Sequence, residues 1–247
     1  MSGETVLFDG KDEWGQVRVI EQGPHRILSF GPADEQSRIL TKQPWVLQHD
    51  YTRAMMLSLL FCQPKRALVL GVGGGCLISA LATAVKGIKI TGVELRPLVT
   101  EMALTHFRLP RSKRIELVHQ EGAAFLAEGK HKRVDLLFTD LYGADAVDDV
   151  QLNERFIDDA AVLLKEDGML VLNCWEEHRY HEGLNRALAR HFPVCHSCPT
   201  ADGNLVILAG RTPLTQSLAQ LREKAQQLSP KLGYALVDSL GRLEPWD

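Results

Sequence analysis

The stretch LVLGVGGGCLISALATAV, residues 68–85, decides the fold that we expect of this chain. It begins with a short apolar run typical of a buried strand, passes through four glycines between positions 71 and 75, and continues as an apolar helix. Glycines between a strand and a helix allow a tight turn and let a ligand approach the backbone closely. Residues 71–76 contain no acid, no Lys, and no Ser or Thr. The loop is therefore predicted to offer a ligand only its backbone.

Strands and helices alternate on the C-terminal side of this stretch. Apolar runs that predict strands are found at residues 66–71, 88–94, 114–120, 133–140, 168–175, 193–197 and 204–210. Helical patterns separate the first six of these runs, and continuous apolar strands alternating with helices indicate a parallel sheet covered on both faces. We therefore expect an α/β protein with a Rossmann-like, mostly parallel sheet of seven strands.

The N-terminal region has a different pattern. Short β-type runs at 5–8, 16–22, 25–30 and 36–40, separated by glycine turns, predict a small antiparallel sheet. A helix is expected at 49–61. The predicted organisation is a small β domain (1–45), a Rossmann-like nucleoside-binding transferase domain (46–212), and a C-terminal helix and tail (213–247).

Composition excludes several functional classes. The 247 residues carry a formal net charge of −3, so they provide no basic surface of the kind that nucleic acid requires. No apolar run approaches the roughly 18 to 20 residues needed to cross a membrane, and the polar start MSGETVLFDGKDEWG differs from a secretory signal. The five cysteines are expected to be free thiols. We expect a cytoplasmic protein without nucleic-acid or membrane partners.

Acidic residues follow three consecutive predicted strands. Glu94 ends the second strand, 19 positions after Gly75, Glu121 follows the third, and Asp140 ends the fourth. A glycine loop with an acid about 20 residues further on is typical of a nucleotide site in which a carboxylate binds the ribose hydroxyls. His178 and His181 have a spacing that a metal could use, but the favoured interpretation is a solvated helix face, and no metal is predicted.

Residues 65–140 resemble the class I S-adenosylmethionine-dependent methyltransferases, and more closely the spermidine synthase (aminopropyltransferase) family. Three flanking features are similar to that family: Gln36-Ser37, Asp50-Tyr51 before a Met-rich helix, and LKEDGMLVLNCW at 164–175. The resemblance implies S-adenosylmethionine or decarboxylated S-adenosylmethionine as the cofactor, a small-molecule acceptor and no metal. Because the family commonly pairs its subunits, it also implies a candidate homodimer.

The resemblance assigns roles to individual residues. Glu94 would bind the ribose hydroxyls, and Glu121 stands where the family has an Asp that accepts a hydrogen bond from the adenine amino group. Asp140 would deprotonate or position the acceptor and is also a candidate for cofactor binding, and Tyr51 would contact the acceptor. Apart from the resemblance, Tyr142 is a candidate substrate-binding and catalytic residue, with capping of the loop as the equal alternative. The remaining cofactor-binding candidates are Gln36, Gly71, Gly73, Gly74, Gly75 and Gly122.

Departures from the family pattern bear on the reaction. Gly74 and Gly143 stand where the family has acids, and Thr52-Arg53 replaces a His-Glu pair, with Arg53 expected to add a cation near the polyamine site. We therefore favour methyl transfer over aminopropyl transfer from the decarboxylated cofactor. A catalytically silent nucleoside-binding or scaffold protein is a third alternative. The acidic segment 143–149 either attracts a cationic acceptor or complements a helix dipole.

Overall fold

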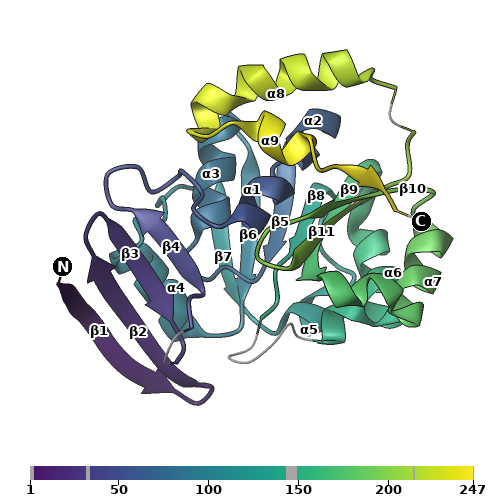
Figure 1. Cartoon of the computed structure of the whole chain (residues 1–247). Coiled ribbons are helices and arrows are strands. Elements are labelled where there is room, and N and C mark those ends of the chain that lie inside the picture. Colours follow the sequence, from purple (N-terminus) through teal and green to yellow (C-terminus); the bar gives the residue numbers. More distant parts are fainter. Residues whose placement is uncertain (1–2, 32–33, 143–148, 214, 247) are drawn as a thin grey trace.

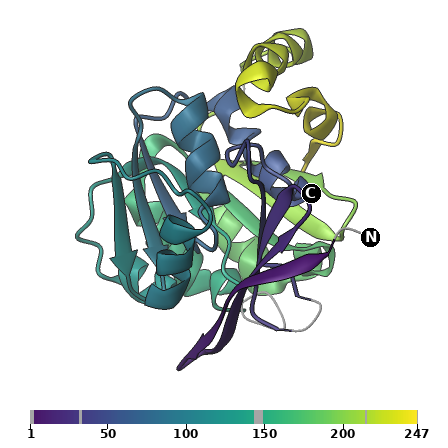
Figure 2. The same cartoon turned by 90° about the vertical axis from the view of Figure 1, so that its left-hand side faces the viewer.

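A computed structural model describes residues 3–31, 34–142, 149–213 and 215–246 of the chain. Two sheets make up its framework (Figure 1). The smaller is an antiparallel meander in the order β1-β2-β3-β4, and its β1–β2 hairpin extends away from the body of the molecule (Figure 2). Its strands are β1 (Glu4–Asp12), β2 (Gly15–Gln22), β3 (His25–Ser29) and β4 (Ser37–Leu40).

The larger sheet has the order β12-β10-β11-β9-β8-β5-β6-β7. Strands β5 to β9 pair in parallel, whereas β11 runs antiparallel to both β9 and β10. The prediction of a Rossmann-like sheet beside a small N-terminal sheet is confirmed. The strands are β5 (Arg66–Leu70), β6 (Lys89–Glu94), β7 (Ile115–His119), β8 (Val134–Thr139), β9 (Leu164–Trp175), β10 (Val194–Pro199), β11 (Asn204–Gly210) and β12 (Glu244–Pro245).

Helices cover both faces of this sheet, and alternate residues of each strand supply the two cores. Ala67 and Val69 of β5 pack into one core, and Leu68 and Leu70 pack into the other. The first core is covered by α1 (Asp50–Met55), α2 (Ser58–Phe61), α3 (Cys76–Ala84), α4 (Pro97–Thr105), α8 (Leu218–Leu232) and α9 (Leu236–Leu240). The second is covered by α5 (Gly122–Ala127), α6 (Glu154–Leu163) and α7 (Glu182–His191).

Two segments differ from the sequence prediction. The helix expected at 49–61 is interrupted, since α1 ends at Met55 and α2 begins at Ser58, whose hydroxyl donates to the Met55 carbonyl. The tail beyond α8 is ordered into α9 and the two-residue strand β12, which pairs with β10 and adds an eighth strand. No helix in the described ranges is long and apolar enough to span a membrane.

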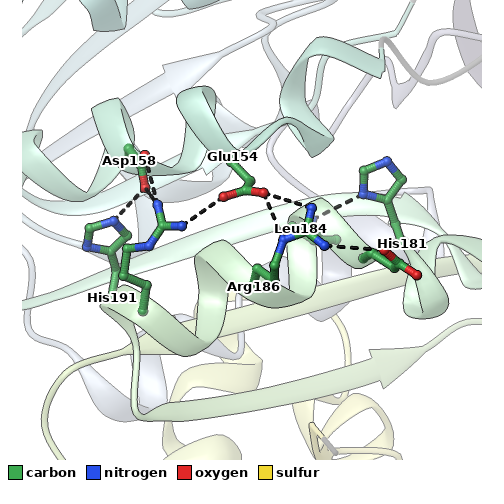
Figure 3. A network of polar contacts seen from close by, with 8 residues as sticks. Glu154, Asp158, His181, Leu184, Arg186 and His191 are labelled. Atoms are coloured by element: carbon green, nitrogen blue, oxygen red, sulfur yellow. Dashed lines mark hydrogen bonds and ion pairs between the residues drawn. The ribbon is translucent and has the colours of Figure 1, made fainter.

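A surface network joins α6 to α7 (Figure 3). Glu154 accepts hydrogen bonds from Arg186 and Arg190, and Asp158 pairs with Arg190 and with His191. His181 caps α7, because its Nδ1 accepts from the Leu184 amide at 3.1 Å. The imidazole of His178 likewise accepts from the Trp175 amide, at the start of the 3₁₀ helix η2 (Glu176–Tyr180).

Candidate active site

A cavity of about 480 Å³ lies at the carboxyl ends of β5, β6 and β8, where the small sheet meets the large one. This is the edge at which open α/β sheets bind ligands. The predicted site residues on its wall are Gln36, Tyr51, Gly71, Gly73, Glu94, Glu121, Gly122, Asp140 and Tyr142. These residues come from distant parts of the sequence, and the fold brings all nine to one cavity.

The backbone amides of the glycine loop are used within the protein. The amides of Val72 and Gly73 donate to the same Glu94 oxygen, at 3.0 and 3.1 Å, and the Gly74 amide donates to the Ser37 hydroxyl at 2.9 Å. Gly71 has a φ of +84°, and a Cβ there would lie 2.1 Å from the carbonyl oxygen of Asp140. The loop therefore needs glycine at position 71, because the backbone of Asp140, directly after β8, passes so close to it.

Gly74 and Gly75 do not belong to the cavity wall. A Cβ on Gly74 would lie 2.8 Å from the Phe107 ring and 2.9 Å from Ser37, and one on Gly75 would lie 2.6 Å from Leu109. The space beside position 74 is thus filled by neighbouring side chains and does not open toward a ligand. This placement argues against the predicted contact of these two glycines with the cofactor, which stays a prediction.

Glu94 holds the loop and faces the cavity at the same time. Besides the two loop amides, its carboxylate accepts from the Arg96 amide at 3.1 Å. Burial raises the pKa of Glu94, and these three hydrogen bonds act in the opposite direction. A carboxylate has about four lone-pair sites, so the arrangement leaves capacity for a further donor such as a ribose hydroxyl.

Glu121 is also occupied by the protein itself. Its two carboxylate oxygens accept from the amides of Ala123 and Ala124, at 2.7 and 2.6 Å, and so cap helix α5. Gln36, another residue of the cavity wall, donates through its Nε2 to Asp34 at 2.8 Å. Both residues line the cavity. A ligand that contacts them would have to bind to the hydrogen-bonding positions of their side chains that these internal bonds do not occupy.

Asp140 lies at the centre of a buried polar network. One carboxylate oxygen accepts from the Asn173 amide nitrogen at 2.9 Å, and the other accepts from the Tyr51 hydroxyl at 3.2 Å. Asn204 continues the chain, since its Nδ2 donates to the Asn173 amide oxygen at 3.3 Å and to the Tyr142 hydroxyl at 3.0 Å. Burial raises the pKa of Asp140 to about 6, although the bonds from Asn173 and Tyr51 lower it.

Several cavity residues were missed in the sequence. The sequence held a signal for Asn173, a polar residue that interrupts the apolar run of β9. In the structure it is fully buried and hydrogen-bonded to Asp140. The sequence held no such signal for three other cavity residues, Glu35, Asp202 and Asn204. They come from loops or strand ends that only the fold brings to this edge. Glu35 is paired with Arg38, so its negative charge is compensated.

Arg53 requires a correction. The expected cation beside the acceptor does not line the cavity: its Nε donates to the Leu47 carbonyl at 2.8 Å, and its guanidinium lies over the Tyr234 ring, 5.2 Å from the centroid. The preceding residue, Thr52, does face the cavity. Repulsion by Arg53 is therefore no argument against a cationic acceptor. Gly143 and all but the last residue of the acidic segment 143–149 lie outside the described residues.

No family model matches the chain. Among curated proteins, the chain is 28% identical over 233 residues to a polyamine aminopropyltransferase of Neisseria meningitidis serogroup B, with 92% of this chain and 88% of that protein covered. It is 27% identical over 170 residues to the eEF1A lysine and N-terminal methyltransferase homolog of Drosophila melanogaster, covering 64% of this chain and 25% of that protein.

Solved structures agree on the fold. A probable spermidine synthase from Corynebacterium glutamicum superposes with a TM-score of 0.78 at 16% identity, covering 98% of this chain and 91% of that one. Human methyltransferase-like protein 13 in complex with SAH gives a TM-score of 0.67 at 20% identity, with coverages of 75% and 93%. The same architecture is thus found in proteins named for two kinds of transfer.

Proposed function

We propose, on the premise that this chain is a divergent member of the spermidine synthase-like family and a transferase, that it moves a methyl group from S-adenosylmethionine to a nitrogen of a small acceptor. The relative from Drosophila melanogaster is named for methylation of nitrogen, and methyltransferase-like protein 13 holds SAH. In this proposal Glu94 binds the ribose, and Gln36, Glu121 and Gly122, which line the same cavity, contact the rest of the nucleoside.

The observation that carries the proposal is the placement of Asp140. An amine nitrogen must present its lone pair to the methyl carbon, and a carboxylate within hydrogen-bond reach can hold the amine and take its proton. The N–C bond forms as the C–S bond breaks, the electron pair stays on sulfur, and the N–H proton moves to Asp140. Tyr51 and Asn173 fix this carboxylate from two sides.

Methyl transfer is favoured over aminopropyl transfer by the wall near the glycine loop. Position 74 has no acid, and the space beside it is filled by Phe107 and Ser37, so nothing there holds the amine of an aminopropyl group. Cys76, the next cavity residue of this segment, is a buried thiol whose pKa burial raises to about 12, so it is uncharged. Aminopropyl transfer is kept as a second candidate because of the relative in Neisseria meningitidis.

Calorimetric titration with three ligands tests this function. We expect S-adenosylmethionine and methylthioadenosine to bind, and S-adenosylmethionine to bind more tightly than its decarboxylated form. Glu94→Gln should weaken methylthioadenosine binding at least about tenfold, since a charged acceptor is replaced by a neutral one. Glu101→Gln, on the exposed surface of α4, is the matched control.

Asp140→Asn separates binding from chemistry. It should leave nucleoside affinity within about threefold of the wild type and reduce turnover at least about a hundredfold, the usual contribution of a general base. Preference for the decarboxylated cofactor would favour aminopropyl transfer instead. Failure of all three ligands to bind would favour a protein without catalytic activity.

A further inference from the structure

Three polar side chains come from neighbouring strands of the large sheet and are hydrogen-bonded in a row. Asp140 directly follows β8, and Asn173 lies on the adjacent strand β9. Val206 of β11 pairs with Asn173, so Asn204, two positions away on β11, lies on the same face of the sheet as Asn173. The strand register therefore sets the order Asp140, Asn173, Asn204.

The direction of each amide in this row depends on its neighbour. An ionised carboxylate only accepts hydrogen bonds, so Asn173 must direct its NH₂ group toward Asp140 and its amide oxygen away from it. The Nδ2 of Asn204 carries two hydrogens, and it donates to that oxygen at 3.3 Å and to the Tyr142 hydroxyl at 3.0 Å. A donor from Asn204 is thus matched to the orientation of Asn173 that serves the ionised form of Asp140.

The backbone of Asn204 is held independently of its side chain. Its amide donates to the Thr200 hydroxyl at 3.1 Å, and its carbonyl accepts from the Thr200 amide at 2.9 Å and from the Thr200 hydroxyl at 3.1 Å. These bonds close the turn between β10 and β11. A change of the buried Asn204 side chain should therefore keep the turn and remove the bonds to Asn173 and Tyr142.

We propose that Asn204 is a positioning residue for Asp140: by donating to the Asn173 amide oxygen, it keeps the Asn173 NH₂ group turned toward the carboxylate. The role of Asp140 as the base rests on the proposed function, whereas the coupling between Asn204 and Asp140 does not. Without a donor at position 204, the Asn173 amide can turn over and bring its oxygen to Asp140. Two oxygens share a hydrogen bond only if one of them carries a proton, so the protonated form of Asp140 is favoured and its pKa rises.

The titratable groups nearest to Asp140 are uncharged where it titrates. Burial raises the pKa values of Tyr51, Cys76 and Tyr142, and the charge of Asp140 raises them further, so these groups of α1, α3 and the segment after β8 are neutral near pH 6. The remaining titratable side chains of the described cavity wall are Asp34, Glu35, His49, Glu94, Glu121 and Asp202. They are common to the wild type and to variants at position 204, so a difference between the titrations is not due to them.

Carbon-13 NMR of the carboxyl groups, on the full chain labelled at aspartate, measures the titration of Asp140 directly, and Asp140→Asn identifies its signal. Asn204→Leu has a similar size and no donor. We expect the pKa of Asp140 to lie about one unit higher in this variant, since a hydrogen bond to a charged group is lost. Asn204→Ser, whose hydroxyl ends one atom short of the amide, should raise the pKa as well. A pKa that rises in neither variant would overturn the inference.

Further variants test whether the effect passes through Asn173. In the Asn173→Leu background, Asn204→Leu should raise the pKa of Asp140 no further, because the amide that Asn204 orients is gone. Tyr142→Phe removes the other bond of Asn204 and should leave the pKa of Asp140 close to the wild-type value. An equal rise in the wild-type and Asn173→Leu backgrounds would show that Asn204 acts by packing, and would contradict the positioning role.

Asn185→Leu is the matched control. Asn185 of α7, outside the described cavity wall, also makes two side-chain hydrogen bonds: it donates to the Arg179 carbonyl at 2.9 Å and accepts from the Trp246 indole at 3.1 Å. The loss of these bonds should lower stability without moving the pKa of Asp140. A shift as large as that of Asn204→Leu would show that any loss of stability moves this pKa, and would contradict the inference.

The outcomes for the inference and for the proposed function are separable. The titration needs neither cofactor nor turnover, so a failure of methyl transfer from S-adenosylmethionine would contradict the proposed function while a raised pKa in the Asn204 variants still supported the inference. Methyl transfer by the wild type, together with an unchanged pKa in both Asn204 variants, would support the proposed function and overturn the inference.

Discussion

Asp140 combines burial with two hydrogen-bond donors, and the two effects act on its pKa in opposite directions. Burial dominates and raises the pKa to about 6, whereas the bonds from Asn173 and Tyr51 favour the ionised form. The side chain is thereby placed near neutrality, where a general base works best. A single residue at a strand end thus acquires its chemistry from burial and from two neighbours far away in the sequence.

The pH dependence of turnover should reveal this tuning. Since only the ionised carboxylate can take a proton, we expect kcat/KM to rise with pH through an inflection near 6. Asn173→Leu removes a bond that favours the charged form, so the inflection should move to higher pH. A profile recorded on both proteins checks this, and an inflection that does not move would show that Asn173 only packs.

At the scale of elements, the unit formed by β5, the glycine loop and α3 packs the two sheets together. Helix α3 begins at Cys76, directly after a glycine at a φ of +74°, and the loop before it lies against Ser37 of β4, Phe107 and Leu109. The small sheet is therefore joined to the glycine loop through one hydroxyl–amide bond of 2.9 Å. The missing side chain at position 74 is explained by this close contact.

Restoring an acid at position 74 should therefore fail structurally. Gly74→Asp would overlap Phe107 and Ser37 and bury an unpaired charge, and we expect it to lower the free energy of unfolding by about 3 kcal/mol. Urea denaturation measures this, with Gly3→Asp, where no atom lies within 4 Å of the new Cβ, as the control. A stable variant with increased affinity for decarboxylated S-adenosylmethionine would contradict the explanation.

At the scale of the whole molecule, the C-terminal segment is tied to the first helix. Arg242 donates two hydrogen bonds, at 2.6 and 2.8 Å, to Asp50 at the start of α1, and Asp50 also accepts from the Ala201 amide. The Arg242 guanidinium holds the pKa of Asp50 below its usual value. Helices α8 and α9, which lie over α1 to α3 (Figure 1), add Leu221, Leu232 and Leu236 to the core.

Removal of the ion pair between Arg242 and Asp50 should lower the stability of the fold measurably. Arg242→Leu is expected to lower the free energy of unfolding by about 1 kcal/mol at neutral pH, because the pair is partly exposed. The pKa of Asp50 is lowered in the folded state, so the contribution is present above pH 4 and is lost as the pH falls through the folded pKa. Denaturation at pH 7 and at pH 3 tests this. An equal difference between variant and wild type at both pH values would contradict it.

The sequence by itself determined the architecture and the edge of the sheet on which the site lies. Alternating strands and helices, a glycine loop after the first parallel strand, and acids after the next three strands are local or periodic patterns, and the carboxyl ends of parallel strands must share one edge. For this reason Glu94, Glu121 and Asp140 could be placed at one cavity before any coordinate was known.

Only the tertiary structure decided which of these groups face a ligand and with which partners. The space beside Gly74 is filled by Phe107, and the Arg53 guanidinium lies over Tyr234. Asn173 donates to Asp140 and accepts from Asn204. These outcomes depend on contacts between residues far apart in the chain, and no local pattern encodes the direction in which a side chain must point to fill the space left by another.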